Sequence, residues 1–300
     1  MTSPVLGTLA LSRGTVDRVT ARRHDEQWLD AAWRDLRSRV LVVAEGEALV
    51  KVDDERAELR FVLPEQAPEG TRLLLGQDSD GVVYFGVAAA GLPPARGGFA
   101  PASLREVGSL LGDRDAGLLV HAVALANWHA THTHCPRDGA PTVPDTAGHS
   151  TRCPADGSEH FPRSDPAVIM LVTDPDDRCL LARNAAWPGR RVSILAGFVE
   201  PGESAEQAVV REVAEETAIT VTNVRYVGSQ PWPMPWSLML GFRADAPAGQ
   251  DIVVDHTELA EARWFSRAEL LASLHSGEVA LPPPSSIARR IIESWFGGPL

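Results

Sequence analysis

Residues 197–219 read GFVEPGESAEQAVVREVAEETAI, and this stretch decides the fold of the part of the chain around it. Pro201 and Gly202 are typical of a turn. Ser204 is followed three residues later by Gln207, which is the pattern of a capping box. The sequence therefore predicts a turn followed by a helix that begins near Ser204.

Three glutamates share one face of this predicted helix. At about 100° per residue, Glu212, Glu215 and Glu216 lie on the same side. Like charges at this spacing repel each other, so the protein must either solvate them or neutralise them with cations. Hard divalent cations such as Mg²⁺ or Mn²⁺ prefer carboxylate oxygens. Periodicity alone leaves a solvated acidic face and a metal site both open.

The order of residues in this stretch resembles the Nudix box, G-x5-E-x7-R-E-U-x-E-E-x-G-U, in which U is aliphatic. Gly197, Glu203 and residues 211–219 match its defining positions with one exception, since Ala218 stands where the late glycine is expected. A glycine suits the end of a helix because positive φ costs other residues about 1 kcal/mol or more. The exception concerns the helix exit and leaves the carboxylates in place.

A second stretch, residues 229–237, reads SQPWPMPWS. Three prolines and two tryptophans predict a stiff aromatic loop, which alone indicates either a recognition segment or a rigid connection. At this distance from the acidic helix it resembles the S-Q-P-W-P-F-P-x-S array of the NADH pyrophosphatase branch of the Nudix superfamily. Met234 replaces an aromatic residue of that array. The resemblance covers about residues 101–296 and is faint before them.

This resemblance implies site residues at the matching positions. The catalytic glutamates would be Glu212, Glu215 and Glu216, and either Glu215 or Glu216 would activate water. The same three carboxylates, with Glu258 and the backbone carbonyl of Ala196, would hold the metal. Substrate contacts would come from Arg105, Phe161, Phe198, Gln230, Pro231, Trp232, Pro233, Met234, Pro235, Trp236, Ser237 and Ala288. The residues themselves leave two roles open for each phenylalanine, stacking on adenine or packing in the core.

The function implied by the resemblance is hydrolysis of the pyrophosphate of NADH or NAD⁺ to nicotinamide mononucleotide and AMP. Mg²⁺ or Mn²⁺ would be the cofactor, a homodimer is expected, and NAD-capped RNA is a further substrate that the same chemistry could open. Two alternatives stay open. One is a Nudix hydrolase of another nucleoside diphosphate derivative such as ADP-ribose, and the other is a non-catalytic NAD-sensing protein.

Two short segments with cysteines resemble the halves of a zinc ribbon. Each half reads C-x2-D-G, with Cys135 and Asp138 in the first and Cys153 and Asp156 in the second. A zinc ribbon has C-x2-C-G twice, and carboxylates are weaker zinc ligands than thiolates. The four side chains could still form a tetrahedral site, but the ligand set favours a ribbon without structural zinc that turn chemistry holds together.

Composition narrows the class of protein. The chain has 300 residues, is 44% hydrophobic and carries a net charge of −12, which argues against duplex DNA as a partner. No basic segment followed by a long apolar run is present at the start, so a cytoplasmic protein without a membrane partner is expected. Three cysteines do not suggest a disulfide framework.

The predicted fold class is α+β. We expect a small β-rich N-terminal domain over residues 1–114, and a connecting helix with the degenerate zinc-ribbon-like segment over 115–164. A C-terminal Nudix domain, an α/β/α sandwich with a mixed sheet, is expected over 165–300. No internal repeat is evident from the sequence.

Overall fold

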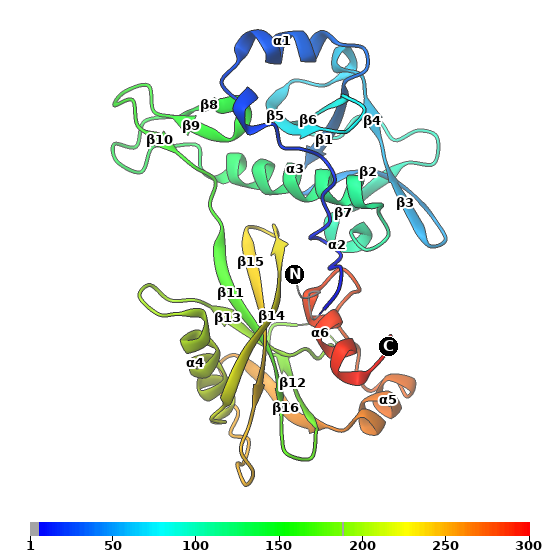
Figure 1. Ribbon diagram of the computed structural model, residues 1–300, viewed down its shortest axis with the longest axis vertical. Coiled ribbons are helices and arrows are strands. Elements are labelled where there is room, and N and C mark those ends of the chain that lie inside the picture. The colour runs from blue at the N-terminus through cyan, green and yellow to red at the C-terminus, as the bar shows by residue number, and fades with distance from the viewer. Residues whose placement is uncertain (1–5, 188) are drawn as a thin grey trace. The chain divides into compact units, whose positions relative to one another are not determined.

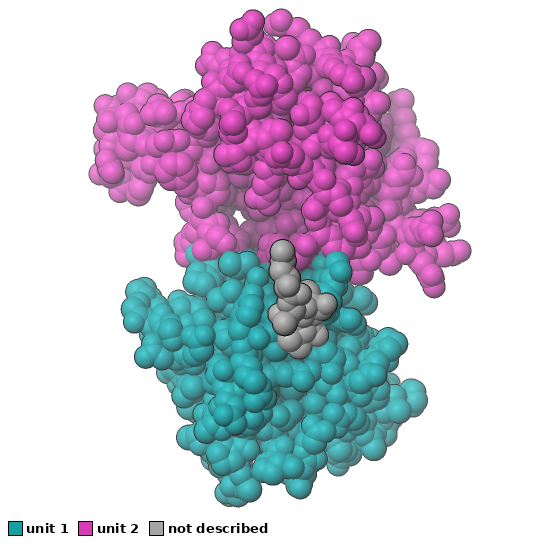
Figure 2. Space-filling model, viewed as in Figure 1, with its two compact units in different colours: residues 1–10, 165–230, 237–300 teal, residues 11–164, 231–236 magenta. Residues whose placement is uncertain are grey.

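The computed structural model describes residues 6–187 and 189–300, which form two compact units (Figures 1 and 2). Unit 1 contains the described residues of 1–10, 165–230 and 237–300, and unit 2 contains residues 11–164 and 231–236. A loop that lies within the C-terminal half of the sequence therefore belongs to unit 2. The first five residues of the expected N-terminal domain lie outside the described part, and its limit at residue 114 stays a prediction.

Unit 1 is built on a mixed sheet of six strands. The strands are β11 (Asp165–Thr173), β12 (Cys179–Asn184), β13 (Leu195–Phe198), β14 (Thr222–Trp232), β15 (Ser237–Asp245) and β16 (Leu259–Phe265). Their order is β14-β15-β11-β12-β16, with β13 paired to β11. Strands β11 and β15 are parallel over their whole length, whereas β13 runs antiparallel to β11.

Helices cover both faces of this sheet. They are α4 (Ala205–Thr217), α5 (Arg267–His275) and α6 (Ile287–Phe296). Alternate residues of β11 point to opposite faces. Val168 and Met170 pack in one cluster with Val213 of α4, while Ile169 packs in another with Ile291 of α6. Figure 1 shows α4 and α6 on opposite sides of the sheet. This arrangement confirms the expected α/β/α sandwich.

Unit 2 contains a second mixed sheet, of seven strands. They are β1 (Arg39–Ala44), β2 (Glu47–Asp53), β3 (Arg56–Leu59), β4 (Phe61–Val62), β5 (Gly70–Gln77), β6 (Val83–Ala89) and β7 (Ala100–Ser103). Strands β1 and β6 are parallel, and their other neighbours in the sheet are antiparallel. The helical segments of this unit are η1 (Thr20–Arg22), α1 (Glu26–Arg34), η2 (Pro64–Gln66), α2 (Leu104–Val107), α3 (Asp113–Thr131) and η3 (Thr146–Gly148).

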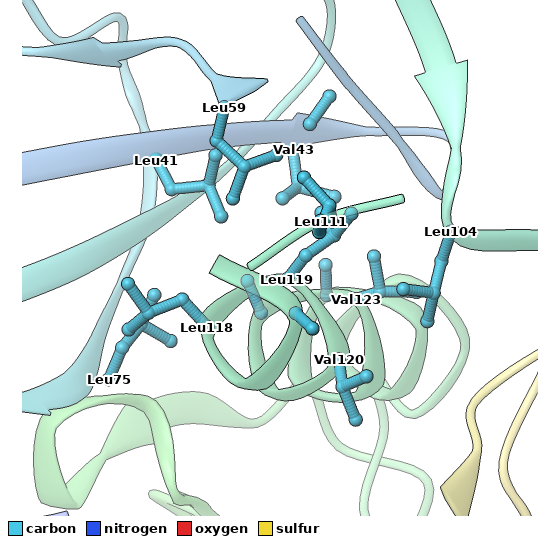
Figure 3. Close-up of a cluster of buried hydrophobic side chains, with 14 of the residues drawn as sticks. Leu41, Val43, Leu59, Leu75, Leu104, Leu111, Leu118, Leu119, Val120 and Val123 are labelled. Atoms are coloured by element: carbon cyan, nitrogen blue, oxygen red, sulfur yellow. The ribbon is translucent and has the colours of Figure 1, made fainter. Parts of the chain in front are cut away.

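Helix α3 packs on this sheet through aliphatic side chains. Leu118, Leu119 and Val123 of the helix are buried in one cluster with Leu41 of β1 and Leu75 of β5 (Figure 3). The expected connecting helix is present and largely buried, and its side chains form part of the core of unit 2.

A small sheet of three strands follows α3 in the same unit. Its strands are β8 (Val143–Asp145), β9 (Ser150–Arg152) and β10 (Glu159–His160). This is the segment where the sequence predicts a degenerate zinc ribbon. Among the helices of residues 6–187 and 189–300, none combines the length and apolar character that a membrane crossing requires.

Candidate active site

Helix α4 begins where its sequence predicts, and it ends in a left-handed residue although the expected glycine is absent. The Ser204 hydroxyl accepts a hydrogen bond from the Gln207 backbone N–H at 3.2 Å, and the Gln207 side chain accepts one from the Ser204 N–H at 2.8 Å. This reciprocal pair is the expected capping box. At the other end Ala218 adopts a left-handed conformation, with φ of 57°. The helix thus keeps the glycine-type exit although an alanine occupies it.

Arg211 holds the acidic residues of this region together. Its guanidinium donates to Glu203 at 2.6 Å, to Glu212 at 2.9 Å and to Glu215 at 3.0 Å. It also donates to the backbone carbonyl of Phe198 at 2.9 Å. These contacts raise the pKa of Arg211 and lower the pKa of Glu203. Arg211 therefore pairs with three acidic side chains of this region.

Gly197 is required by the position of Glu212. A Cβ atom built on Gly197 would lie 1.9 Å from the carboxyl carbon of Glu212, well inside van der Waals contact. Strand β13 therefore crosses directly over that carboxylate. This close approach explains why a glycine stands at this position, and the sequence alone does not show it.

Glu212 and Glu216 are buried, with 9% and 6% of their surface exposed, whereas Glu215 is exposed. One oxygen of Glu216, Oε2, has no hydrogen-bond partner in the described residues. Burial, and then the charges of Glu212 and Glu258, raise the pKa of Glu216 to about 8. Burial is also the main cause of the raised pKa of Glu212. An unpartnered buried carboxylate beside other acids fits a cation, which would neutralise it.

Among the described residues, the ligand atoms of these carboxylates do not lie close enough together to form one metal-binding set. Arg211 engages one oxygen of Glu212 and one of Glu215, and Glu258 is exposed. The donor chemistry fits Mg²⁺ or Mn²⁺, since both take carboxylate and carbonyl oxygens. Ala196 supplies such a carbonyl position on β13, where it pairs with Ile169 of β11.

The segment before Glu258 is tied to the end of α4. The N–H of Asp255 donates to the carbonyl of Glu216 at 3.0 Å, and the N–H of Glu258 donates to the carbonyl of Asp255 at 3.3 Å. Asp255 also contributes to the raised pKa of Glu216. Sequence reasoning missed Asp255, and the only signal for it was its position three residues before Glu258.

The two phenylalanines are on the surface of their units. Phe198, on β13, is 58% exposed, and Phe161, in the segment before β11, is 67% exposed. A core role, which the sequence left open for each, is therefore wrong. An exposed aromatic ring suits contact with a ligand better than it suits a structural role.

The remaining predicted substrate residues of unit 1 are anchored in the fold. Gln230 is fully buried, and its side-chain amide donates to the carbonyl of Ser285 at 2.9 Å. Ser237 pairs with Asp165 at the start of the parallel strands. Ala288 is buried near the beginning of α6, and its N–H donates to the hydroxyl of Ser286 at 3.2 Å. Gln230 thus links the base of the proline-rich loop to the segment before α6.

The tip of that loop, residues 231–236, packs within unit 2. Trp232 and Met234 border the aliphatic core around α3. The guanidinium carbon of Arg105 lies 5.3 Å from the centroid of the Trp232 ring, a cation–π distance. Asn127 donates to the carbonyls of Pro233 and Pro235, at 2.8 and 3.4 Å. Trp236 completes this set through the His132 ring, whose centroid is 5.6 Å away. The structure thus brings Arg105 and the loop together.

The four residues of the degenerate ribbon also come together. One ligand atom each from Cys135, Asp138, Cys153 and Asp156 lies within 4.8 Å of the others. The Cys153 thiol is 3.5 Å from Asp138 Oδ2, and Ser158 donates its hydroxyl to Asp156 at 2.5 Å. The hydrogen bonds from the hydroxyl and the backbone N–H of Ser158 lower the pKa of Asp156 to about 2. Neighbouring groups such as Ser158 also form hydrogen bonds with these four residues. The set fits zinc less well than four cysteines would, because half of the thiolates are absent.

Three family models match the chain. The NUDIX domain matches residues 163–282, and the NADH pyrophosphatase zinc ribbon domain matches residues 130–161. The NADH pyrophosphatase-like rudimentary NUDIX domain matches residues 29–128. The last match gives residues 29–128 a relationship to the NUDIX domain, although no internal repeat is evident from the sequence. Sequence reasoning missed this relationship because residues 29–128 have no acidic box.

Full-length relatives support the same assignment. The chain is 43% identical to the NAD-capped RNA hydrolase NudC of Mycobacterium bovis, over 95% of this chain and 94% of that protein. Identity and coverage are the same for the NAD-capped RNA hydrolase NudC of Mycobacterium tuberculosis. The NAD-capped RNA hydrolase NUDT12 of Homo sapiens is 40% identical over 62% of this chain and 43% of that protein.

Proposed function

This chain belongs to the NADH pyrophosphatase branch of the Nudix hydrolases, and on that premise we propose that it is a metal-dependent diphosphatase of NADH and NAD⁺. The products would be nicotinamide mononucleotide and AMP. The observation that carries the proposal is Glu216, a buried carboxylate with an unpartnered oxygen beside Glu212. Such a group is costly to bury unless a cation or a proton neutralises it.

Several residues would hold Mg²⁺ or Mn²⁺ in this site. They are Glu212, Glu215, Glu216 and Glu258, with the backbone carbonyl of Ala196. When bound, a divalent cation neutralises charge on the phosphate oxygens and lowers the pKa of a bound water. The chain itself positions the carboxylates: Arg211 fixes Glu212 and Glu215, and Gly197 leaves the space that Glu212 occupies.

The two candidate water-activating glutamates have different surroundings. Glu215 is exposed and is anchored to Arg211 through one oxygen, so its other oxygen is accessible to a water. Glu216 is buried and has no such anchor in the described residues. We therefore assign water orientation to Glu215 and cation binding to Glu216.

The substrate residues extend the proposal to the dinucleotide. The exposed rings of Phe198 and Phe161 would stack on a flat base. Arg105 with residues 231–236 would contact the substrate, and Gln230 would hold the base of their loop. Relatives named as NAD-capped RNA hydrolases favour a second substrate, the NAD cap at an RNA 5′ end. Cleavage there would break the same pyrophosphate bond.

The test is product analysis with NADH and either Mg²⁺ or Mn²⁺. Wild-type protein should release AMP and nicotinamide mononucleotide, and EDTA should stop the release. Glu216→Gln should lower turnover by about a hundredfold or more because it removes a charged ligand. Glu206→Gln, an exposed glutamate in the same helix, serves as the matched control and should stay within about twofold of wild type.

Two outcomes would redirect the proposal. NADH binding without AMP release would favour an NAD-sensing protein. A substrate panel in which ADP-ribose is cleaved faster than NADH would favour the alternative function, a Nudix hydrolase of another nucleoside diphosphate derivative. We also propose a homodimer, which light scattering on the purified protein tests, and a cytoplasmic location, which cell fractionation tests.

A further inference from the structure

A cleft in unit 2 is lined by none of the residues that the proposed function uses. Three cavities of about 530, 340 and 270 Å³ share Arg72 in their walls. The largest is also lined by Arg23, His24 and residues 144–148. Small-molecule sites are typically clefts of roughly 300–1,000 Å³. The cleft has the size of such a site.

Two arginines supply positive charge to this cleft. The guanidinium carbon of Arg72 lies 4.1 Å from the centroid of the Trp33 ring, and the side chain is exposed. Nε of Arg23 is buried without a hydrogen-bond partner. Neither arginine makes an ion pair within residues 6–187 and 189–300. Guanidinium groups with unused donors favour an anion, above all a phosphate or a carboxylate.

The backbone beside these arginines is strained. Thr146, Ala147 and Gly148 line the largest cavity and all have positive φ, of 45°, 53° and 85°. This conformation costs residues other than glycine, and a β-branched residue such as threonine rarely adopts it. His129 Nε2 lies 2.8 Å from the Gly148 carbonyl and helps to hold the segment. Strain that the surroundings maintain is a feature of ligand sites.

The smallest cavity gives the cleft an apolar part. Leu29, Leu74, Phe85 and Trp33 line it, and Trp33 and Phe85 meet edge to face with ring centroids 5.1 Å apart. A flat ring fits such a wall. Glu26 and Asp30 line the same cavity, and their charges oppose a second phosphate near it.

We propose that this cleft binds a nucleoside monophosphate, with the phosphate at Arg72 and Arg23 and the base in the apolar cavity beside Trp33. The proposal goes beyond the proposed function and does not depend on it. The arginines select the anion, the apolar cavity selects the ring, and the carboxylates of α1 select one phosphate over two or three.

Calorimetric titration with AMP in the presence of EDTA tests this proposal on the full chain. Wild-type protein should bind AMP, and ADP and ATP should bind at least several-fold more weakly. Arg72→Ala should weaken AMP binding by about tenfold or more, because it removes a charged hydrogen-bond donor. Arg23→Gln should weaken it as well. Arg96→Ala, an exposed arginine of the same unit that lines none of these cavities, should leave it unchanged.

Hydrogen exchange distinguishes AMP binding in this cleft from AMP binding at the proposed active site. AMP should slow exchange in residues 20–34 and 143–149 of wild-type protein and not in Arg72→Ala. Arg72→Ala should keep the thermal midpoint and the rate of NADH hydrolysis of Arg96→Ala, which excludes a folding defect. Slower exchange in residues 20–34 and 143–149 with AMP that survives Arg72→Ala and Arg23→Gln would overturn the proposal. Inorganic phosphate that binds as tightly as AMP would overturn the assignment of the base.

Discussion

At the scale of single residues, the site depends on one missing side chain. Gly197→Ala would place a methyl group 1.9 Å from the carboxyl carbon of Glu212. The strand or the carboxylate must shift, and a shift of about 1 Å at a catalytic group costs about a hundredfold in rate. NADH turnover should fall accordingly, with circular dichroism recording whether the fold persists.

Gly298→Ala is the matched control for this substitution. A Cβ at Gly298 meets no atom within 4 Å, and this residue is not at positive φ. Its turnover should equal that of wild type. Equal rates for Gly197→Ala and Gly298→Ala would contradict the close approach of β13 to Glu212.

The roles of the three glutamates could be predicted only in part from the sequence. Helical periodicity predicted that Glu212, Glu215 and Glu216 share one face of the helix, and Arg211 contacts the first two of them. Periodicity does not show which of these carboxylates the neighbouring strand covers. Glu212 and Glu216, one helical turn apart, are buried, whereas Glu215 lies beside Arg211 and stays exposed. Glu212 lies against Gly197 of β13, and helical periodicity does not show that contact.

At the scale of elements, the C-terminal end of α4 offers a substitution that should increase the stability of the protein. Ala218 has φ of 57°, which costs an L-residue about 1–2 kcal/mol, while glycine loses about 0.5–1 kcal/mol of chain entropy. Ala218→Gly should therefore stabilise the protein by about 0.5 kcal/mol. Urea denaturation measures the change in the free energy of unfolding.

Ala214→Gly provides the opposite case in the same helix. Ala214 is exposed in the helix interior, where glycine costs about 1 kcal/mol relative to alanine. The two alanine-to-glycine substitutions should thus have opposite signs. Destabilisation of similar size by both would show that Ala218 is not left-handed in solution.

The ligand set of the degenerate ribbon predicts how much zinc the protein contains. Wild-type protein should contain well under one zinc per chain, because Asp138 and Asp156 replace thiolates. Asp138→Cys combined with Asp156→Cys restores four thiols at positions that already lie within 4.8 Å of each other. This variant should bind about one zinc per chain and become more stable with the metal.

Elemental analysis after dialysis against a weak chelator measures both proteins. Asp176→Cys combined with Asp251→Cys adds the same number of thiols at exposed positions, and it should bind no zinc. One tightly held zinc in the wild-type chain would contradict the interpretation that hydrogen bonds have replaced the metal.

At the scale of the whole molecule, the sequence predicts the two halves unequally. The C-terminal sandwich follows from a box of charged residues in a fixed order. The N-terminal part has no such box, so sequence motifs do not reveal its relationship to the rudimentary NUDIX domain. Its sheet is held by aliphatic residues such as Leu41 and Leu118, which many different sequences could supply (Figure 3). A catalytic site is therefore easier to predict from the order of residues in a sequence than the packing of an aliphatic core is.

The stability of unit 2 should depend on pH through a pair of histidines, of which His121 is buried and His149 is partly buried. His121 and His149 have ring centroids 5.1 Å apart, and His149 Nε2 lies 2.8 Å from the Leu74 carbonyl. Burial lowers the pKa of His121 to about 3 and that of His149 to about 4, and the charges of Arg18 and Arg23 act in the same direction. Both pKa values lie below the value of about 6.5 in an unfolded chain.

The unfolded chain therefore binds more protons than the folded protein once the pH falls below about 6.5. The stabilisation is complete above that pH and is lost as the pH falls toward about 4, at roughly 1.4 kcal/mol per pH unit for each histidine. His149→Gln removes one titrating group and keeps a donor for Leu74. Urea unfolding from pH 7 to 5 should show a shallower loss for His149→Gln than for wild type. His275→Gln, at an exposed histidine, should follow wild type, and parallel curves for all three proteins would mean that the histidine pair does not control acid stability.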